Sequence, residues 1–249
     1  FPWFIPCFGT STAEIFNYYW WDPAPDNEKL LRQFAERIAG KEAGPHLRNA
    51  WKYASRAIDH SPELNQAYFI GVYYIGPAHP MCADPNAKIP EEFDTFAGGT
   101  FVLKPTGNVP VFAKFYRRMA NSLELAAKEV DQADKLAGKT NRLLLDSEIS
   151  NIRWFYRTFR STANYYESCI IRDKLLALAA KKDKSPEEIA EAKALYADWR
   201  KILLDEQENA VESISIVTAD MRLDPYYGVT GNITPGKFHS KDMIAKTLE

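Results

Sequence analysis

One apolar stripe in the middle of the chain constrains the fold more than any other feature. Between residues 145 and 170, apolar side chains recur at steps of four and three without interruption. They are Leu145, Ile149, Ile152, Tyr156, Phe159, Ala163, Tyr166 and Ile170. This spacing keeps all of them on one face of an α-helix. A helix this long has no local way to bury such a stripe, so other long helices must cover it. The sequence therefore predicts an all-α fold, an antiparallel helical bundle.

Two further long helices are expected around this central one. The first is predicted over about residues 110–136. The central helix is expected to begin near Thr140 and to run for roughly 40 residues, or about 60 Å. The third is predicted from Ser185-Pro186-Glu187-Glu188, which has the spacing of a capping box with proline in the first turn. The inward residues expected on the third helix are Ile189, Ala192, Tyr196, Trp199, Leu203, Ala210 and Val217.

Residues 1–75 are expected to form shorter helical hairpins. Ser11 and Glu14 have the spacing of a capping box for a first helix, and Asp26 is a candidate N-cap for a second. Gly40 suits the end of that second helix, and Pro45 suits the first turn of a third. The third helix carries an apolar stripe of Leu47, Ala50, Trp51, Ala54 and Ile58. Short connections favour antiparallel neighbours.

Residues 76–110 differ from the rest because they contain six prolines. Helix cannot persist through such a segment. We therefore predict a proline-rich irregular arm, with at most a short strand at residues 100–103 and a fourth helix before the arm, from Ser61-Pro62. Residues 111–249 are expected to hold the long helices and an irregular C-terminal segment, in one compact domain overall.

Charge and hydropathy argue against two classes of partner. The chain has 31 Lys and Arg against 33 Asp and Glu, a net charge of −2, whereas nucleic-acid binders carry a basic excess. No stretch reaches the roughly 18 apolar residues that span a bilayer. We therefore expect no nucleic-acid partner and no membrane span. No phosphate-binding or nucleophile-elbow motif is present, and no cofactor is expected.

Glu206 falls on the inward stripe of the third long helix, where an apolar residue is expected. A buried carboxylate needs a partner. Three arginines of the central helix can supply one: Arg153, Arg157 and Arg160. Two interpretations follow. Glu206 belongs to a structural ion pair inside the bundle, as is common in helical bundles, or it contacts a ligand at the mouth of the bundle.

Four aromatic doublets are candidates for sugar contacts: Trp20-Trp21, Tyr73-Tyr74, Tyr165-Tyr166 and Tyr226-Tyr227. Neighbours on a helix point about 100° apart, so one member can enter the core while the other meets solvent. A flat ring packs well on the apolar face of a pyranose. Core packing is the alternative for each residue. The candidates retained are Trp20, Trp21, Tyr73 and Tyr74, with His79 in the arm and Glu206.

His79, Cys82 and Asp84 cluster in the arm and suggest a metal site. Their spacing fits no closed zinc pattern and a fourth ligand is not evident, so we predict no metal. A glycosidase needs two carboxylates flanking the scissile bond, and the sequence singles out no such pair. No catalytic residue is predicted.

Two stretches of the chain resemble a known family. The first comprises Gly9–Glu14, Trp20-Trp21-Asp22-Pro23, Leu30-Leu31, Phe34, Gly40 and Ala50-Trp51 through Ile58. The second comprises Glu206 through Ala210, then Asp220, Arg222 and residues 240–246. Together these resemble the C-terminal helical region of α-glucuronidase-like and related TIM-barrel glycoside hydrolases, over roughly 80 residues at the two ends of the chain.

The resemblance implies a non-catalytic C-terminal helical domain of a secreted or periplasmic carbohydrate-active protein, which supports the barrel and its cleft. The family's catalytic carboxylates lie on barrel strands, so none is carried over. We interpret the apolar start at Phe1 as the end of a buried segment. The partners expected are therefore an N-terminal catalytic domain, a carbohydrate and a second copy in a homodimer. The alternative is a free-standing helical module that binds a sugar or a protein.

Overall fold

A computed structural model describes residues 11–19, 26–61, 81, 84–86, 95–96, 101–102, 108–138 and 142–219. Its helices are α1 (Ser11–Tyr18), α2 (Asn27–Ala39), α3 (Gly44–Ile58), α6 (Val109–Leu136), α7 (Arg142–Ala179) and α8 (Pro186–Ala219). Strand β1 (Thr95–Phe96) pairs with β2 (Phe101–Val102) in an antiparallel ladder. The predicted all-α fold with three long helices is confirmed. The fourth predicted helix lies beyond residue 61, outside the described residues.

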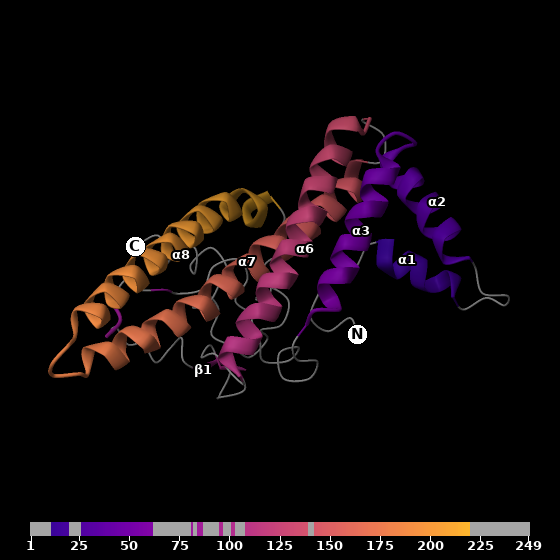
Figure 1. Cartoon of the computed structure of the whole chain (residues 1–249). Coiled ribbons are helices and arrows are strands. Elements are labelled where there is room, and N and C mark those ends of the chain that lie inside the picture. Colours follow the sequence, from indigo (N-terminus) through magenta and orange to yellow (C-terminus); the bar gives the residue numbers. More distant parts are fainter. Residues whose placement is uncertain are drawn as a thin grey trace.

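The long helices pack in sequence order (Figure 1). Helix α6 contacts both α3 and α7, α2 packs on α3 and touches α7, and α8 packs on α7. Helix α7, at 38 residues, is about 57 Å long. It therefore reaches from the end of the molecule that holds α2 to the end where α8 begins.

Local signals set the helix ends. Asp26 caps α2, because its Oδ1 accepts a hydrogen bond from the backbone N–H of Lys29 at 3.0 Å. Gly40 follows that helix with φ of 91°, a conformation that glycine adopts without steric cost. Ser185 and Glu188 form the predicted capping box, with reciprocal hydrogen bonds of 3.0 and 3.3 Å between backbone and side chains. These three helix ends therefore follow from local sequence.

Close packing of α2 on α3 depends on Gly44, the first residue of α3. A Cβ at this position would lie 2.9 Å from the Cα of Glu36. Real Cβ atoms do not approach backbone so closely, so glycine is required where the two helices meet. This contact fixes the short turn between α2 and α3.

Two apolar clusters form the core. The first joins α2, α3, α6 and α7 around Leu47, Val130 and Leu145. The second joins α3, α6 and α7 around Met119 and Phe159. Among the described residues, neither cluster includes a residue of α8. Helix α8 is therefore held to the bundle in a different way.

The predicted stripe of α7 is the face that enters both clusters. Leu145, Ile149 and Ile152 belong to the first cluster, and Phe159, Ala163 and Tyr166 to the second. The remaining two members, Tyr156 and Ile170, pack against the second cluster while partly exposed. The prediction that one face of this helix needs cover from other helices is confirmed.

Three expected core residues are exposed instead. Ile58 ends α3 and points outward. Ile189 and Tyr196 were predicted to face inward on α8, and both are exposed, whereas Trp199 and Ala210 are buried as predicted. The reason is that α8 turns a polar face toward α7, centred on Glu206 and its neighbours.

Candidate functional site

Small polar side chains line the face of α7 that meets α8. Ser161, Asn164 and Ser168 are all buried and contact α8. Short side chains let a neighbouring helix approach closely, and their polar atoms need partners once water is excluded. Trp199 of α8 provides one, because its indole Nε1 donates to Ser168 Oγ at 2.5 Å. Helix α8 is thus matched to α7 by hydrogen bonds.

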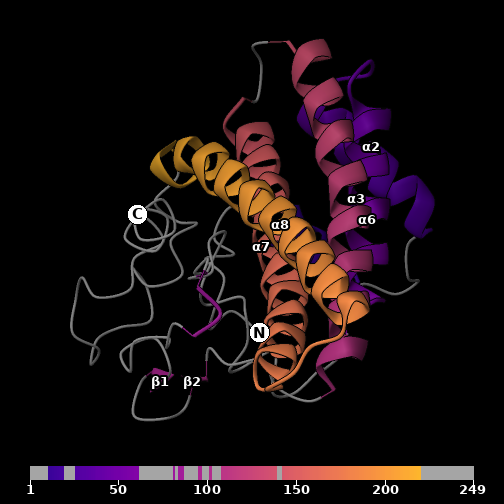
Figure 2. The same ribbon diagram turned by 60° about the vertical axis from the view of Figure 1, so that its left-hand side comes forward.

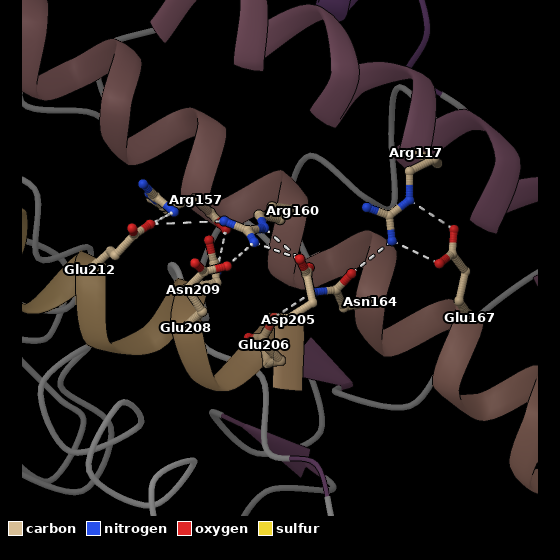
Figure 3. Close-up of polar contacts among 10 residues, drawn as sticks. All are labelled: Arg117, Arg157, Arg160, Asn164, Glu167, Asp205, Glu206, Glu208, Asn209 and Glu212. Atoms are coloured by element: carbon tan, nitrogen blue, oxygen red, sulfur yellow. Dashed lines mark hydrogen bonds and ion pairs between the residues drawn. The ribbon is translucent and has the colours of Figure 1, made fainter. Parts of the chain in front are cut away.

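Glu206 lies at the centre of this interface, with 1% of its surface exposed. Its carboxylate accepts hydrogen bonds from Ser161 Oγ at 2.5 Å and from Asn164 Nδ2 at 3.0 Å. Figure 3 shows the group turned toward α7. The sequence predicted both the burial of Glu206 and the helix that it faces. It did not predict the hydroxyl and amide partners.

Arg160 of α7 holds the outer edge of the interface. Its guanidinium donates to Asp205 from Nε at 3.1 Å and from Nη2 at 2.5 Å, and to Glu208 at 2.8 Å. Burial alone raises the pKa of Asp205, but the hydrogen bonds from Arg160 and Asn164, with the charges of Arg160 and Arg117, outweigh it and hold this pKa below its usual value. Asp205 therefore remains ionised and paired.

Asn164 extends the network to a third helix. Its Oδ1 accepts a hydrogen bond from Nη2 of Arg117 on α6 at 2.7 Å, while its Nδ2 donates to Asp205 at 2.7 Å and to Glu206. Arg117 also pairs with Glu167 through bonds of 2.9 and 2.7 Å. One amide thus links α6, α7 and α8.

The network continues toward the C-terminal end of α8. Asn209 Nδ2 donates to the backbone carbonyl of Arg157 at 3.0 Å, and the Arg157 guanidinium pairs with Glu212. Ser213, buried one turn later, donates its hydroxyl to the carbonyl of Asn209 at 2.6 Å. From Trp199 to Glu212, the contacts of α8 with α7 therefore extend over more than three helical turns.

The whole arrangement is called here the polar layer. It comprises Ser161 and the ten residues drawn in Figure 3: Arg117, Arg157, Arg160, Asn164, Glu167, Asp205, Glu206, Glu208, Asn209 and Glu212. Its charged groups are bound to one another across helices. A catalytic acid needs access to substrate, and Glu206 is enclosed by protein. The burial of Glu206 and its bonds from the neutral side chains of Ser161 and Asn164 are what a structural role requires. Its role as a ligand contact stays a prediction.

The other predicted sugar contacts lie outside the described residues: Trp20, Trp21, Tyr73, Tyr74 and His79. Of the suggested metal cluster, Asp84 is described and accepts a hydrogen bond from the backbone N–H of Asn86 at 2.9 Å. Within the described ranges, no three His, Cys, Asp or Glu side chains are grouped so as to hold a metal ion.

None of the helices in the described ranges combines the length and hydrophobicity needed to cross a bilayer.

The structure adds a surface that sequence reasoning missed, at the end of α1. Tyr18 and Tyr19 are 42% and 44% exposed. Tyr18 meets Phe34 of α2 edge to face, with ring centroids 5.3 Å apart, and the Tyr19 hydroxyl donates to Asn27 Oδ1 at 2.8 Å. The signal was available, because these tyrosines directly precede Trp20-Trp21. A run of four aromatic residues predicts that some of them are exposed, because consecutive residues of a helix point in different directions.

An ion pair borders the two tyrosines. Both carboxylate oxygens of Glu14 accept from the Arg37 guanidinium, at 2.6 and 2.5 Å, and both side chains are about half exposed. Arg37 also lies over the ring of Phe34, 4.4 Å from its centroid. We call Glu14, Tyr18, Tyr19, Asn27 and Arg37 the α1 platform.

Comparison with protein-family models, with curated proteins and with solved structures finds no match to this chain.

Proposed function

We propose that this chain is a non-catalytic helical module of a carbohydrate-active protein and that the α1 platform contacts the sugar. The observation that carries the proposal is the exposure of Tyr18 and Tyr19, two consecutive residues whose side chains are both supported by α2. Tyrosine presents an apolar ring and a polar hydroxyl, which suit the C–H face and the hydroxyls of a pyranose.

The two rings are held in place before any ligand binds. Phe34, itself buried, supports Tyr18, and Asn27 fixes the hydroxyl of Tyr19. A side chain that is already ordered loses less conformational entropy on binding, which favours affinity. Preorganised aromatic rings at a surface therefore support a binding role over a role in core packing.

The neighbouring charges support binding rather than acid catalysis. The hydrogen bond from Arg37 holds the pKa of Glu14 below its usual value, against a smaller opposite effect of burial. A general acid must keep its proton near neutral pH, and Glu14 does not. Its carboxylate and the guanidinium of Arg37 instead offer fixed acceptors and donors for sugar hydroxyls.

The resemblance to TIM-barrel glycoside hydrolases supplies the carbohydrate class and a secreted or periplasmic location. In that family the catalytic carboxylates belong to barrel strands. Within the described residues the strands are β1 and β2, of two residues each. The proposed division of labour is that a preceding barrel performs catalysis and this module supports the barrel and the sugar.

Titration of the full chain with xylo- and gluco-oligosaccharides, with and without uronic acid branches, tests the binding role by calorimetry. We expect Tyr18→Ala and Tyr19→Ala each to weaken binding by about tenfold. The matched control is Tyr196→Ala, an equally exposed tyrosine on α8, which should leave affinity unchanged. Absence of binding to every sugar, or equal affinity in all variants, would overturn the platform.

Hydrolysis of aryl glycosides by the purified chain tests the non-catalytic role. We expect no turnover above that of a preparation from cells lacking the gene. Turnover that copurifies with the chain and that is altered by substitution of one of its carboxylates would contradict the proposal.

A further inference from the structure

Helix α8 carries a stripe of large apolar residues on its exposed side. Each of the five residues is between 44% and 50% exposed. This is unusual because a helix of this length normally turns its polar residues to solvent. The five are Ile189, Tyr196, Leu204, Val211 and Ile214. At 100° per residue, these positions fall within about 80° of the helix circumference. We call them the α8 stripe.

The α8 stripe stays exposed to solvent because α8 binds the bundle through another face. The polar layer faces α7, and α8 makes no contribution to either apolar cluster among the described residues. Figure 2 shows α8 lying in front of α7, at the outside of the helical array. Exposed Lys193, Arg200 and Gln207 lie within the same arc, between the apolar residues. Exposed apolar side chains gathered on one face are typical of an interaction site.

We propose that the α8 stripe pairs two copies of this chain, with the two α8 helices antiparallel. A second copy is the partner that the charges beside the stripe favour. An antiparallel pair with its two-fold axis near Leu204 sets Tyr196 of one copy against Val211 of the other, twice, with Leu204 near its own mate. The same axis sets Ile189 against Thr218 and Ile214 against Lys193, so apolar residues meet apolar residues only in the middle of the stripe.

The charges beside the stripe fit the same orientation. The N-terminal half of this face carries exposed Lys193 and Arg200. The C-terminal half carries Glu208 and Glu212, whose side chains are 62% and 45% exposed even though they pair with arginines of α7. An antiparallel pair sets each basic half against an acidic half, whereas a parallel pair sets like charges together. Electrostatics therefore select the antiparallel form.

The size of the stripe indicates a weak association. The 26 residues from Ile189 to Ile214 span about 38 Å, and a helix face is about 10 Å wide. The contact is then about 400 Å² per copy, half of the roughly 800 Å² per partner in stable complexes. We expect a dissociation constant in the range of about 10–100 µM.

Sedimentation velocity of the full chain over a hundredfold concentration range measures this association. The unaltered chain should convert from monomer to dimer with rising concentration. Leu204→Glu places two like charges near the two-fold axis and should weaken dimerisation at least about tenfold. The matched control is Leu125→Glu on α6, since Leu125 is 42% exposed and Leu204 46%, and this variant should dimerise like the parent.

Disulfide trapping tests the orientation independently. In a background with Cys7→Ser and Cys82→Ser, single variants Tyr196→Cys and Val211→Cys should not crosslink under mild oxidation, because each cysteine is remote from its own mate. An equal mixture of the two variants should give a covalent dimer, since a disulfide needs Cα atoms about 4.4–6.8 Å apart. Crosslinking within each single variant would contradict the antiparallel pairing. A chain that remains monomeric at all concentrations would overturn the proposal, and so would a dimer unaffected by Leu204→Glu.

Discussion

The carboxylate of Glu148 on α7 accepts a hydrogen bond from the indole Nε1 of Trp51 on α3 at 2.9 Å. The same carboxylate accepts from the backbone N–H of Ser11 at 3.2 Å and from the Ser11 hydroxyl. Glu148 is buried. A negative charge at the N-terminus of a helix is favourable, because the first N–H groups of the helix have no internal partner. One acid thus fastens α1 and α3 to the central helix.

Glu148→Ala should lower the free energy of unfolding by about 2–4 kcal/mol, because it removes this acceptor from the partly buried Trp51 and the buried Ser11. Urea denaturation followed by circular dichroism measures the change. Glu124→Ala removes an exposed pair with Lys128 and should cost less than about 1 kcal/mol. Equal losses in the two variants would show that Glu148 does not fasten the helices.

Glu206→Ala should loosen α8 more than the rest of the bundle. The change removes an acceptor of the buried Ser161 hydroxyl and one of the two acceptors of Asn164 Nδ2, which should cost about 1–3 kcal/mol. Hydrogen exchange followed by mass spectrometry should show faster exchange in α8, with α6 unchanged. Glu191→Ala, at an exposed position of the same helix, serves as control. Uniform loss of protection across all helices would contradict a local role for the polar layer.

The polar layer should weaken in acid. The pKa of Asp205 in the folded chain lies below its usual value, so the unfolded chain binds more protons at low pH. The stabilising contribution is therefore present above about pH 4 and is lost as the pH falls through the folded pKa. Asp205→Asn should lower stability at pH 7 and have a smaller effect near pH 3. Urea midpoints at the two values compare parent and variant, and an equal effect at both would refute this assignment.

Cys169 should be unreactive in the folded chain. Burial is the main cause that raises the pKa of its thiol to about 11, and the thiolate is the reactive form. In a background with Cys7→Ser and Cys82→Ser, a thiol reagent at pH 8 should label Cys169 only as fast as the helix opens. Addition of urea should raise the rate to that of an exposed cysteine. Rapid labelling without denaturant would contradict the packing of the second cluster.

Local sequence was enough to predict a helix end only where no distant residue competed for the same groups. The box of Ser185 and Glu188 forms as expected, at the exposed start of α8. The similar spacing of Ser11 and Glu14 led to a wrong assignment of partners. Ser11 bonds to Glu148, and Glu14 bonds to Arg37. Both of these partners are far away in sequence, so no local rule identifies them.

Periodicity identified the apolar stripes correctly but not the face by which each helix docks. On α7 the apolar stripe is buried as predicted. The opposite face is buried as well, although it carries small polar residues such as Ser161 and Asn164. On α8 the apolar positions Ile189 and Tyr196 face outward, because Glu206 and its polar neighbours bind α7. Only the partner helix reveals that serine and asparagine form a docking surface.

The two faces of α7 pack against different helices, and this indicates an order in which the helices assemble. Its apolar side completes both clusters with α2, α3 and α6, so these helices can condense without α8. Helix α8 can then pack on a surface of α7 that is already formed. Only the short segment of residues 180–185 connects the two helices. Because exposed ion pairs such as those of Glu208 and Glu212 help to hold α8, the final step should depend more on ionic strength than the earlier ones.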